Sequence, residues 1–225
     1  MVGAVGAAAS PLLALKAEAV APTVMVLGDS IVWGNNLPVP ARDCWLGRVN
    51  ERIGGATCTA LTNRGLGGIC LNYYPTLNNT TYMGKWGPQQ VAAAPPDIAI
   101  VSCGVNDLMV TADMGPIVWG FYNLNTALFQ AGAKQVLFTT ILPYGHGWAQ
   151  PDGWLPALND RRDQVNNWMR AMWGPRGQLI ERDAILEVQY TPYMDARYAL
   201  PDGLHPNAWG ALLLANSFPL AAIGY

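Results

Sequence analysis

The chain has 225 residues, of which 51% are hydrophobic and 12% are charged, and its formal net charge is −2. The hydrophobic share excludes a disordered chain, and the charged share is about half of the ~25% usual in globular proteins. No excess of lysine and arginine is present to attract nucleic acid or an anionic membrane, so we expect a neutral small molecule or polymer as the partner.

Residues 1–21 are rich in alanine, glycine, valine and leucine, and Ala17-Glu18-Ala19 has the small-x-small form of a signal-peptide cleavage site. The segment lacks a basic start, and its apolar run is too short and too broken to span a bilayer. Two interpretations stay open, an export signal and an N-terminal extension that packs on the domain at residues 22–225. The first interpretation predicts a secreted or periplasmic protein without stable membrane insertion.

Apolar runs and turn signals predict strands and helices that alternate along the rest of the chain. The expected strands are Thr23–Leu27, Thr57–Leu61, Asp97–Ser102, Gln135–Ile141 and Gln178–Ile180. The expected helices are Arg42–Ile53, Gln89–Ala94, Ile117–Ala131, Ala157–Met172 and Ala208–Phe218. This alternation predicts a single doubly wound α/β domain with a mostly parallel five-stranded sheet.

The first strand runs directly into Gly28-Asp29-Ser30, which would leave a serine hydroxyl at the strand's carboxyl end, where open α/β sheets bind their ligands. Taken alone, this serine would be interpreted as a helix cap or a turn residue. A serine nucleophile also needs a base and a group that orients the base.

Asp202 and His205 lie three residues apart around a glycine, just before the last helix, and can supply that base and its partner. The other histidine, His146, has no carboxylate at a comparable spacing, so we interpret it as an exposed loop residue or one stacked on Trp148. Ester hydrolysis builds an oxyanion, for which the candidate donors are the backbone N–H groups of Ser30 and Gly68 and the side-chain amide of Asn106. Asp29 and Asp107 are expected to brace the loops by accepting backbone hydrogen bonds.

The four cysteines contain no Cys-x-x-Cys pair, so neither a structural metal nor another cofactor is expected. Cys58 and Cys103 fall in apolar runs and are expected to be buried. In an exported protein Cys44 and Cys70 could form a disulfide.

The chain resembles the GDSL or SGNH hydrolases in four blocks over about residues 23–218, namely Gly28-Asp29-Ser30, Asn63 to Gly68, Gly104-Val105-Asn106-Asp107 and Asp202-Gly203-Leu204-His205-Pro206. The resemblance implies a three-layer α/β/α flavodoxin-like fold. It also implies Ser30 as nucleophile, His205 as base, Asp202 as its orienting carboxylate, and an oxyanion hole from Ser30, Gly68 and Asn106. Aligning Asn63 with the family's asparagine favours Gly68 over Gly67. Val32 replaces the second glycine of Gly-x-Ser-x-Gly, unlike the α/β-hydrolase elbow.

These observations predict a serine esterase, expected to be a monomer, that hydrolyses a small-molecule or glycan ester, with short acyl groups such as acetyl on carbohydrate as the favoured substrate. Aromatic side chains near the site are candidates to line the substrate, and they are Trp33, Tyr73, Tyr74, Tyr144 and Trp148. The alternatives are a lysophospholipase- or thioesterase-type acyl hydrolase, an SGNH-like O-acyltransferase and a non-catalytic carbohydrate-binding module.

Overall fold

The computed structural model describes residues 21–54, 61–146, 154–189 and 191–225. The predictions for residues 1–20, Cys58 and Trp148 therefore lie outside the described residues. The strands are β1 (Val24–Gly28), β2 (Leu61–Gly65), β3 (Ile98–Ser102), β4 (Gln135–Thr139) and β5 (Leu179–Ile180). The α-helices are α1 (Ser30–Trp33), α2 (Pro40–Asp43), α3 (Trp45–Gly54), α4 (Met83–Ala93), α5 (Val105–Val110), α6 (Met114–Gln130), α7 (Trp154–Trp173) and α8 (Ala208–Asn216).

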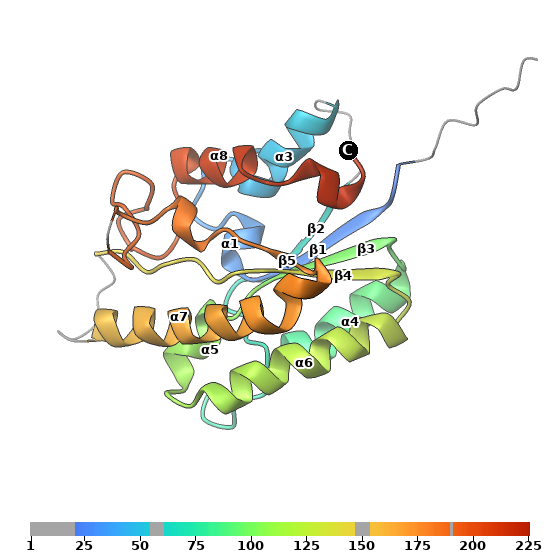
Figure 1. Ribbon diagram of the computed structural model, residues 1–225, viewed down its shortest axis with the longest axis horizontal. Coiled ribbons are helices and arrows are strands. Elements are labelled where there is room, and N and C mark those ends of the chain that lie inside the picture. Colours follow the sequence, from blue (N-terminus) through green and yellow to red (C-terminus); the bar gives the residue numbers. More distant parts are fainter. Residues whose placement is uncertain (1–20, 55–60, 147–153, 190) are drawn as a thin grey trace, which may run out of the picture.

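The five strands form one sheet in the order β2-β1-β3-β4-β5, and every neighbouring pair is parallel. Helices α1, α3 and α8 cover one face, and α4, α5, α6 and α7 cover the other (Figure 1). β1 and β3 carry buried, mostly apolar side chains on both faces. A strand between two helical layers needs this pattern because neither of its faces meets water. The predicted α/β/α fold with a parallel five-stranded sheet is confirmed.

The boundaries of the second strand and of the first long helix differ from the prediction. β2 begins at Leu61, where the predicted strand ends, and Asn63 and Gly65 lie within it because Val26 and Gly28 of β1 pair with them. The helix expected at Arg42–Ile53 is two helices, α2 and α3, separated by Cys44 in extended conformation. Pro40 is the first residue of α2, where its missing N–H costs nothing.

Two helices on the other face also differ from the sequence prediction. α4 begins at Met83, six residues before the predicted start, and contains Pro88 in its interior. Met83 and Gly87 are buried against the core, and this packing offsets the hydrogen bond that the proline lacks. The sequence did not predict α5, a single short helix at residues 105–110 that follows β3 after Gly104.

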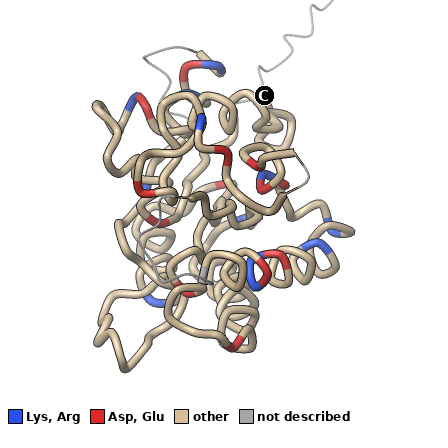
Figure 2. The backbone as a smooth tube through the Cα atoms, turned by 90° about the vertical axis from the view of Figure 1, so that its left-hand side faces the viewer, with Lys and Arg blue, Asp and Glu red and all other residues tan. Residues whose placement is uncertain are grey.

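Cys44, Cys70 and Cys103 are buried free thiols, so the disulfide considered between Cys44 and Cys70 is not formed in this structure. Cys44 lies between α2 and α3, where its sulfur accepts a hydrogen bond from the Gly47 N–H, and Cys70 lies in the loop after β2. Charged residues are sparse and both signs are intermixed along the chain (Figure 2). Within the described part of the chain, no helix has the length and apolar character needed to cross a bilayer.

Candidate active site

Ser30 is mounted at the junction of β1 and α1, at the carboxyl edge of the sheet. The chain turns sharply there, and a Cβ at Gly28 would lie 2.4 Å from the Ser102 carbonyl oxygen, so only glycine fits. Asp29 caps α1 by accepting a hydrogen bond from the Ile31 N–H at 2.9 Å. Ser30 is the first residue of the helix, so its own N–H has no acceptor within the helix.

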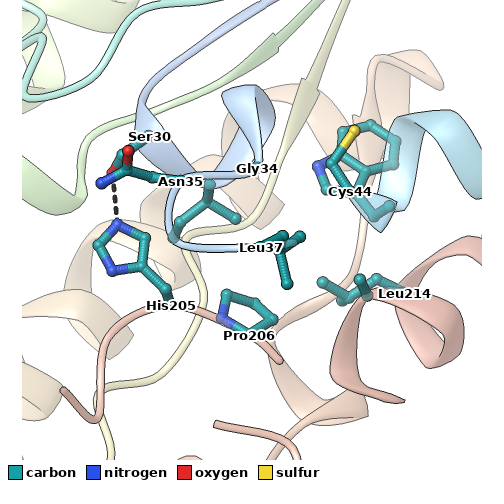
Figure 3. Close-up of a pocket in the computed structure, with 11 residues that line it drawn as sticks. Ser30, Gly34, Asn35, Leu37, Cys44, His205, Pro206 and Leu214 are labelled. Atoms are coloured by element: carbon teal, nitrogen blue, oxygen red, sulfur yellow. Dashed lines mark hydrogen bonds between the residues drawn. The ribbon is translucent and has the colours of Figure 1, made fainter. Parts of the chain in front are cut away.

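The structure brings Ser30, His205 and Asp202 into one hydrogen-bonded series. Nε2 of His205 lies 2.8 Å from Oγ of Ser30 (Figure 3). On the other side of the ring, Nδ1 lies 2.8 Å from Oδ2 of Asp202. Oδ1 of Asp202 accepts hydrogen bonds from the N–H groups of Leu204 and His205, each at 2.9 Å. The local turn therefore fixes the carboxylate, and the carboxylate fixes the ring with Nε2 toward the serine.

Asp202 carries a negative charge in this arrangement. Partial burial disfavours the carboxylate, but hydrogen bonds from the N–H groups of His205 and Leu204 and from the imidazole outweigh it, so the pKa of Asp202 lies below its ordinary value. An anionic Asp202 holds the proton of His205 on Nδ1 and leaves Nε2 as an acceptor for the serine hydroxyl.

Asn36 also contacts Asp202, a contact that the sequence analysis missed. Its Nδ2 lies 3.5 Å from Oδ2 of Asp202, and its φ of 65° is a left-handed conformation that asparagine tolerates better than most residues. The sequence offered one signal for this contact, the pair of adjacent asparagines, Asn35 and Asn36, that follows α1.

The predicted oxyanion donors are two backbone N–H groups and one side-chain amide. Within the described residues, neither Ser30 nor Gly68 donates its N–H to a protein acceptor. Gly68 has a φ of 71°, whereas Gly67 is not in the left-handed region, and the choice of Gly68 as the donor stays a prediction. Asn106, on the first turn of α5, donates one Nδ2 hydrogen to the Ile69 carbonyl at 2.8 Å, and an amide nitrogen has a second hydrogen to offer.

The aromatic residues predicted to line the substrate divide into two groups. Trp33 and Tyr73 are half exposed, at 50% and 47%. The prediction that Tyr74 and Tyr144 line the substrate is wrong, because both side chains are buried. The Tyr74 hydroxyl donates to the Asp107 carboxylate at 2.8 Å, and the Tyr144 hydroxyl donates to the Val105 carbonyl at 2.6 Å. These two rings hold the loops and present no surface to a ligand.

Trp209 is an exposed ring that the sequence analysis overlooked. It lies on the first turn of α8, four residues after His205, and 69% of its surface is accessible. The sequence offered a signal for this ring, because a tryptophan in the first turn of the helix after His205 stands beside a proposed site residue. His146 is exposed, and its ring packs against Tyr193 at a centroid distance of 4.9 Å, so its interpretation as a loop residue holds.

Asp29 and Asp107 are buried carboxylates that brace the site, as expected. Burial raises the pKa of Asp29 to about 7 and that of Asp107 to about 6, against the hydrogen bonds that each accepts from backbone N–H groups. Neither side chain is hydrogen-bonded to Ser30 or His205 among the described residues.

A cluster of carboxylates lies at Asp163, Asp183 and Glu187, beside α7. Arg162 pairs with Asp163 and Glu187, and Arg170 pairs with Asp183. These guanidinium groups already neutralise the cluster, so it is an ion-pair network and carries no argument for a metal.

Comparison with known proteins agrees with this geometry. Residues 26–213 match the GDSL-like lipase/acylhydrolase family. No curated protein matches the chain. A carbohydrate acetylesterase family member from Sinorhizobium meliloti superposes with a TM-score of 0.70 at 16% identity, over 90% of this chain and 99% of that one.

Two further solved structures share the fold. A second carbohydrate acetylesterase from Sinorhizobium meliloti has a TM-score of 0.68 at 17% identity, over 87% of this chain and 95% of that one. The aryl esterase of M. smegmatis has a TM-score of 0.62 at 17% identity, over 88% and 96% of the two chains. The family match over most of the chain confirms the resemblance seen in the four sequence blocks. The chain therefore belongs to the GDSL-like lipase/acylhydrolase family and is a carboxylic ester hydrolase.

Proposed function

We propose that the protein is a serine esterase that works through an acyl-enzyme on Ser30 and prefers short acyl groups, such as acetyl on carbohydrate. The main support for this mechanism is a pair of 2.8 Å contacts, one from Ser30 Oγ to His205 and one from His205 to Asp202. A hydroxyl, a base and an orienting carboxylate in this order are the parts that nucleophilic acyl transfer requires.

The reaction follows from the positions of these atoms. Oγ of Ser30 attacks the ester carbonyl carbon while Nε2 of His205 takes the hydroxyl proton, and Asp202 stabilises the imidazolium. The N–H groups of Ser30 and Gly68 and the amide of Asn106 bind the oxyanion. His205 then returns the proton to the leaving alcohol, and in the second half it takes a proton from the water that attacks the acyl-enzyme, so that the acid is released and Ser30 is restored.

A small cavity beside the nucleophile supports a short acyl group. It has a volume of about 10 Å³, it is bordered by Ser30 and His205, and its apolar walls include Leu37, Pro206 and Leu214 (Figure 3). This volume is about that of one water molecule, which is enough for a methyl group and too small for an alkyl chain. The size of this cavity therefore favours an acetyl group over a long fatty acyl chain.

Exposed rings close in sequence to the site residues support a sugar as the alcohol. Trp33 follows the nucleophile on α1, Tyr73 lies in the loop after Gly68, and Trp209 follows His205 on α8. Flat aromatic faces that are open to solvent can stack on the apolar faces of sugar rings. Two of the structures with this fold are described as carbohydrate acetylesterases.

Covalent labelling tests the mechanism directly. A serine-directed phosphonate is expected to add once to the protein, and mass spectrometry of the peptides should place the adduct on Ser30. A non-catalytic carbohydrate-binding module would bind glycans without reacting, so unlabelled protein that still binds glycans would contradict the proposal.

Enlarging the cavity should change the preferred acyl length. Leu37→Ala is expected to raise the ratio of kcat/KM for a butanoyl ester to that for an acetyl ester about tenfold, because two buried methylenes contribute about 0.8 kcal/mol each. The measurement is a series of chromogenic esters from acetyl to decanoyl. Leu128→Ala, a buried leucine on α6 across the sheet, is the matched control and should leave the ratio unchanged.

The same series addresses the alternatives. Wild-type activity that rises toward decanoyl would contradict the short-acyl assignment and favour a lysophospholipase- or thioesterase-type hydrolase. Acetyl transfer to a sugar hydroxyl that outpaces hydrolysis would favour the O-acyltransferase.

A further inference from the structure

Two consecutive residues of α5 bind the loop that follows Gly68. Asn106 donates its Nδ2 hydrogen to the Ile69 carbonyl at 2.8 Å. Asp107 accepts hydrogen bonds from the Leu71 N–H at Oδ2 and from the Tyr74 hydroxyl at Oδ1, each at 2.8 Å. Helix α5 thus holds the loop at three points within six residues of Gly68, and Asp107 makes two of these three bonds. The N–H groups of Met83 and Gly84 on α4 also bind the loop, at the carbonyls of Cys70 and Leu71.

Asp107 is buried, so its carboxylate anion is stabilised mainly by hydrogen bonds rather than by water. Its side chain is fully buried, and the residues that it binds are buried as well, Leu71 at 1% and Tyr74 at 9% exposure. Burial raises the pKa of Asp107 to about 6, and hydrogen bonds from the Leu71 N–H and the Tyr74 hydroxyl oppose that rise. The backbone N–H groups of Asn72 and of Asp107 itself make smaller contributions in the same direction.

The charge of Asp107 acts on titratable groups in four parts of the chain. They are Asp29 at the end of β1, Cys70 and Tyr74 in the loop itself, Cys103 after β3 and Tyr144 after β4. None of them is a cation, so the anion has no salt-bridge partner among these groups and depends on its hydrogen bonds.

We infer that Asp107 is a positioning residue for the oxyanion hole, which holds the Ile69–Tyr74 segment and through it the N–H of Gly68 beside Asn106. The inference rests on the proposed function, in which Gly68 and Asn106 bind the oxyanion. Gly68 has a left-handed backbone, and a Cβ built there would meet nothing within 4 Å, so side-chain packing does not fix its orientation. The direction of its N–H therefore depends on the residues that follow it, and Asp107 fixes those residues.

A displaced oxyanion donor should affect the transition state more than the bound substrate. The carbonyl oxygen carries full negative charge only after attack, so a misplaced N–H mainly lowers kcat and leaves KM nearly unchanged. This separation of kcat from KM distinguishes a positioning role from a general loss of folded protein, which would lower the active fraction and the thermal stability together.

Three variants test the inference. Asp107→Leu removes both bonds, and we expect kcat to fall by about ten- to a hundredfold with KM within about twofold of wild type. Asp107→Asn removes the charge but keeps both bonds, because its carbonyl can accept from Leu71 while its NH₂ donates to the Tyr74 oxygen. A neutral acceptor holds these bonds more weakly than a carboxylate does, so this variant should recover kcat only in part. Tyr74→Phe removes one bond with little change of shape.

The pH profile of kcat for Tyr74→Phe is the readout that a merely structural role would not move. Loss of the tyrosine donor leaves the Asp107 anion less stabilised, so the pKa of Asp107 should rise and the acid limb of kcat should move to higher pH. Asp107→Asn has no carboxyl group at this position, so the ionisation of residue 107 should no longer contribute to the acid limb of kcat. Tyr122→Phe, whose ring is exposed on α6, is the matched control and should leave the profile unchanged.

The results separate this inference from the proposed function. An acid limb that stays in place in Tyr74→Phe, or a kcat that is unchanged in Asp107→Leu, would overturn the role of Asp107 while phosphonate labelling of Ser30 still supports the esterase. If Asp107→Leu does not fold, Tyr74→Phe alone decides. Wild-type protein that neither hydrolyses esters nor reacts with the phosphonate would instead contradict the proposed function.

Discussion

Ser30→Ala is expected to reduce ester turnover by about 10⁴-fold or more, to the level that oxyanion binding alone can support. Oγ of Ser30 is the atom that faces Nε2 of His205 at 2.8 Å, and alanine leaves nothing there to attack the ester. The backbone N–H of residue 30 remains, so the variant keeps that oxyanion donor. Alanine also suits the first turn of α1, so the fold should not suffer.

The measurement is hydrolysis of a chromogenic acetate ester, with thermal unfolding as the check on folding. Ser102→Ala provides a matched control, because Ser102 ends β3 at the register position next to Gly28 and makes no contact with His205. That variant should keep both turnover and phosphonate labelling. Turnover above a tenth of wild type in Ser30→Ala would show that another group performs the attack.

The parts of the site that the sequence predicted are those fixed by short stretches of chain. Gly28 is the last residue of a strand of five buried residues, and Asp29 and Ser30 follow it directly. Parallel pairing on both sides places that strand inside the sheet. Asp202 and His205 are joined by a turn in which the carboxylate accepts the N–H of His205 itself. Local spacing determines both arrangements, and a parallel sheet brings its strand ends to one edge.

The parts that the sequence did not predict depend on contacts between distant segments. Tyr74 and Tyr144 are of a residue type that is common on binding surfaces. Their hydroxyls, however, donate hydrogen bonds to Asp107 and Val105 of α5, a helix that the sequence pattern did not reveal. Helix α5 has only six residues, too few for a clear apolar period. Without that helix, no partner for either hydroxyl could be inferred, and both rings were assigned to the surface.

Asp202→Asn is expected to lower kcat by about 10⁴-fold, because the amide should force the wrong tautomer on His205. Oδ1 of Asp202 accepts from the N–H groups of Leu204 and His205 at 2.9 Å. An asparagine must keep its carbonyl oxygen at that position, since an NH₂ group there would face two other donors. Its NH₂ group then faces Nδ1 of His205 and donates to it.

A neutral imidazole that accepts at Nδ1 carries its proton on Nε2, which is the atom that faces Ser30 at 2.8 Å. Such a ring cannot take the serine proton, although every heavy atom stays in place. KM should therefore change little, and phosphonate labelling should slow along with kcat. Asp195→Asn makes the same chemical change at a carboxylate that pairs with Arg197 and does not touch His205, so it should keep kcat within about twofold. A loss of less than tenfold in Asp202→Asn would mean that Asp202 does not control the protonation of His205, and that the turn which carries both residues only holds the ring in place.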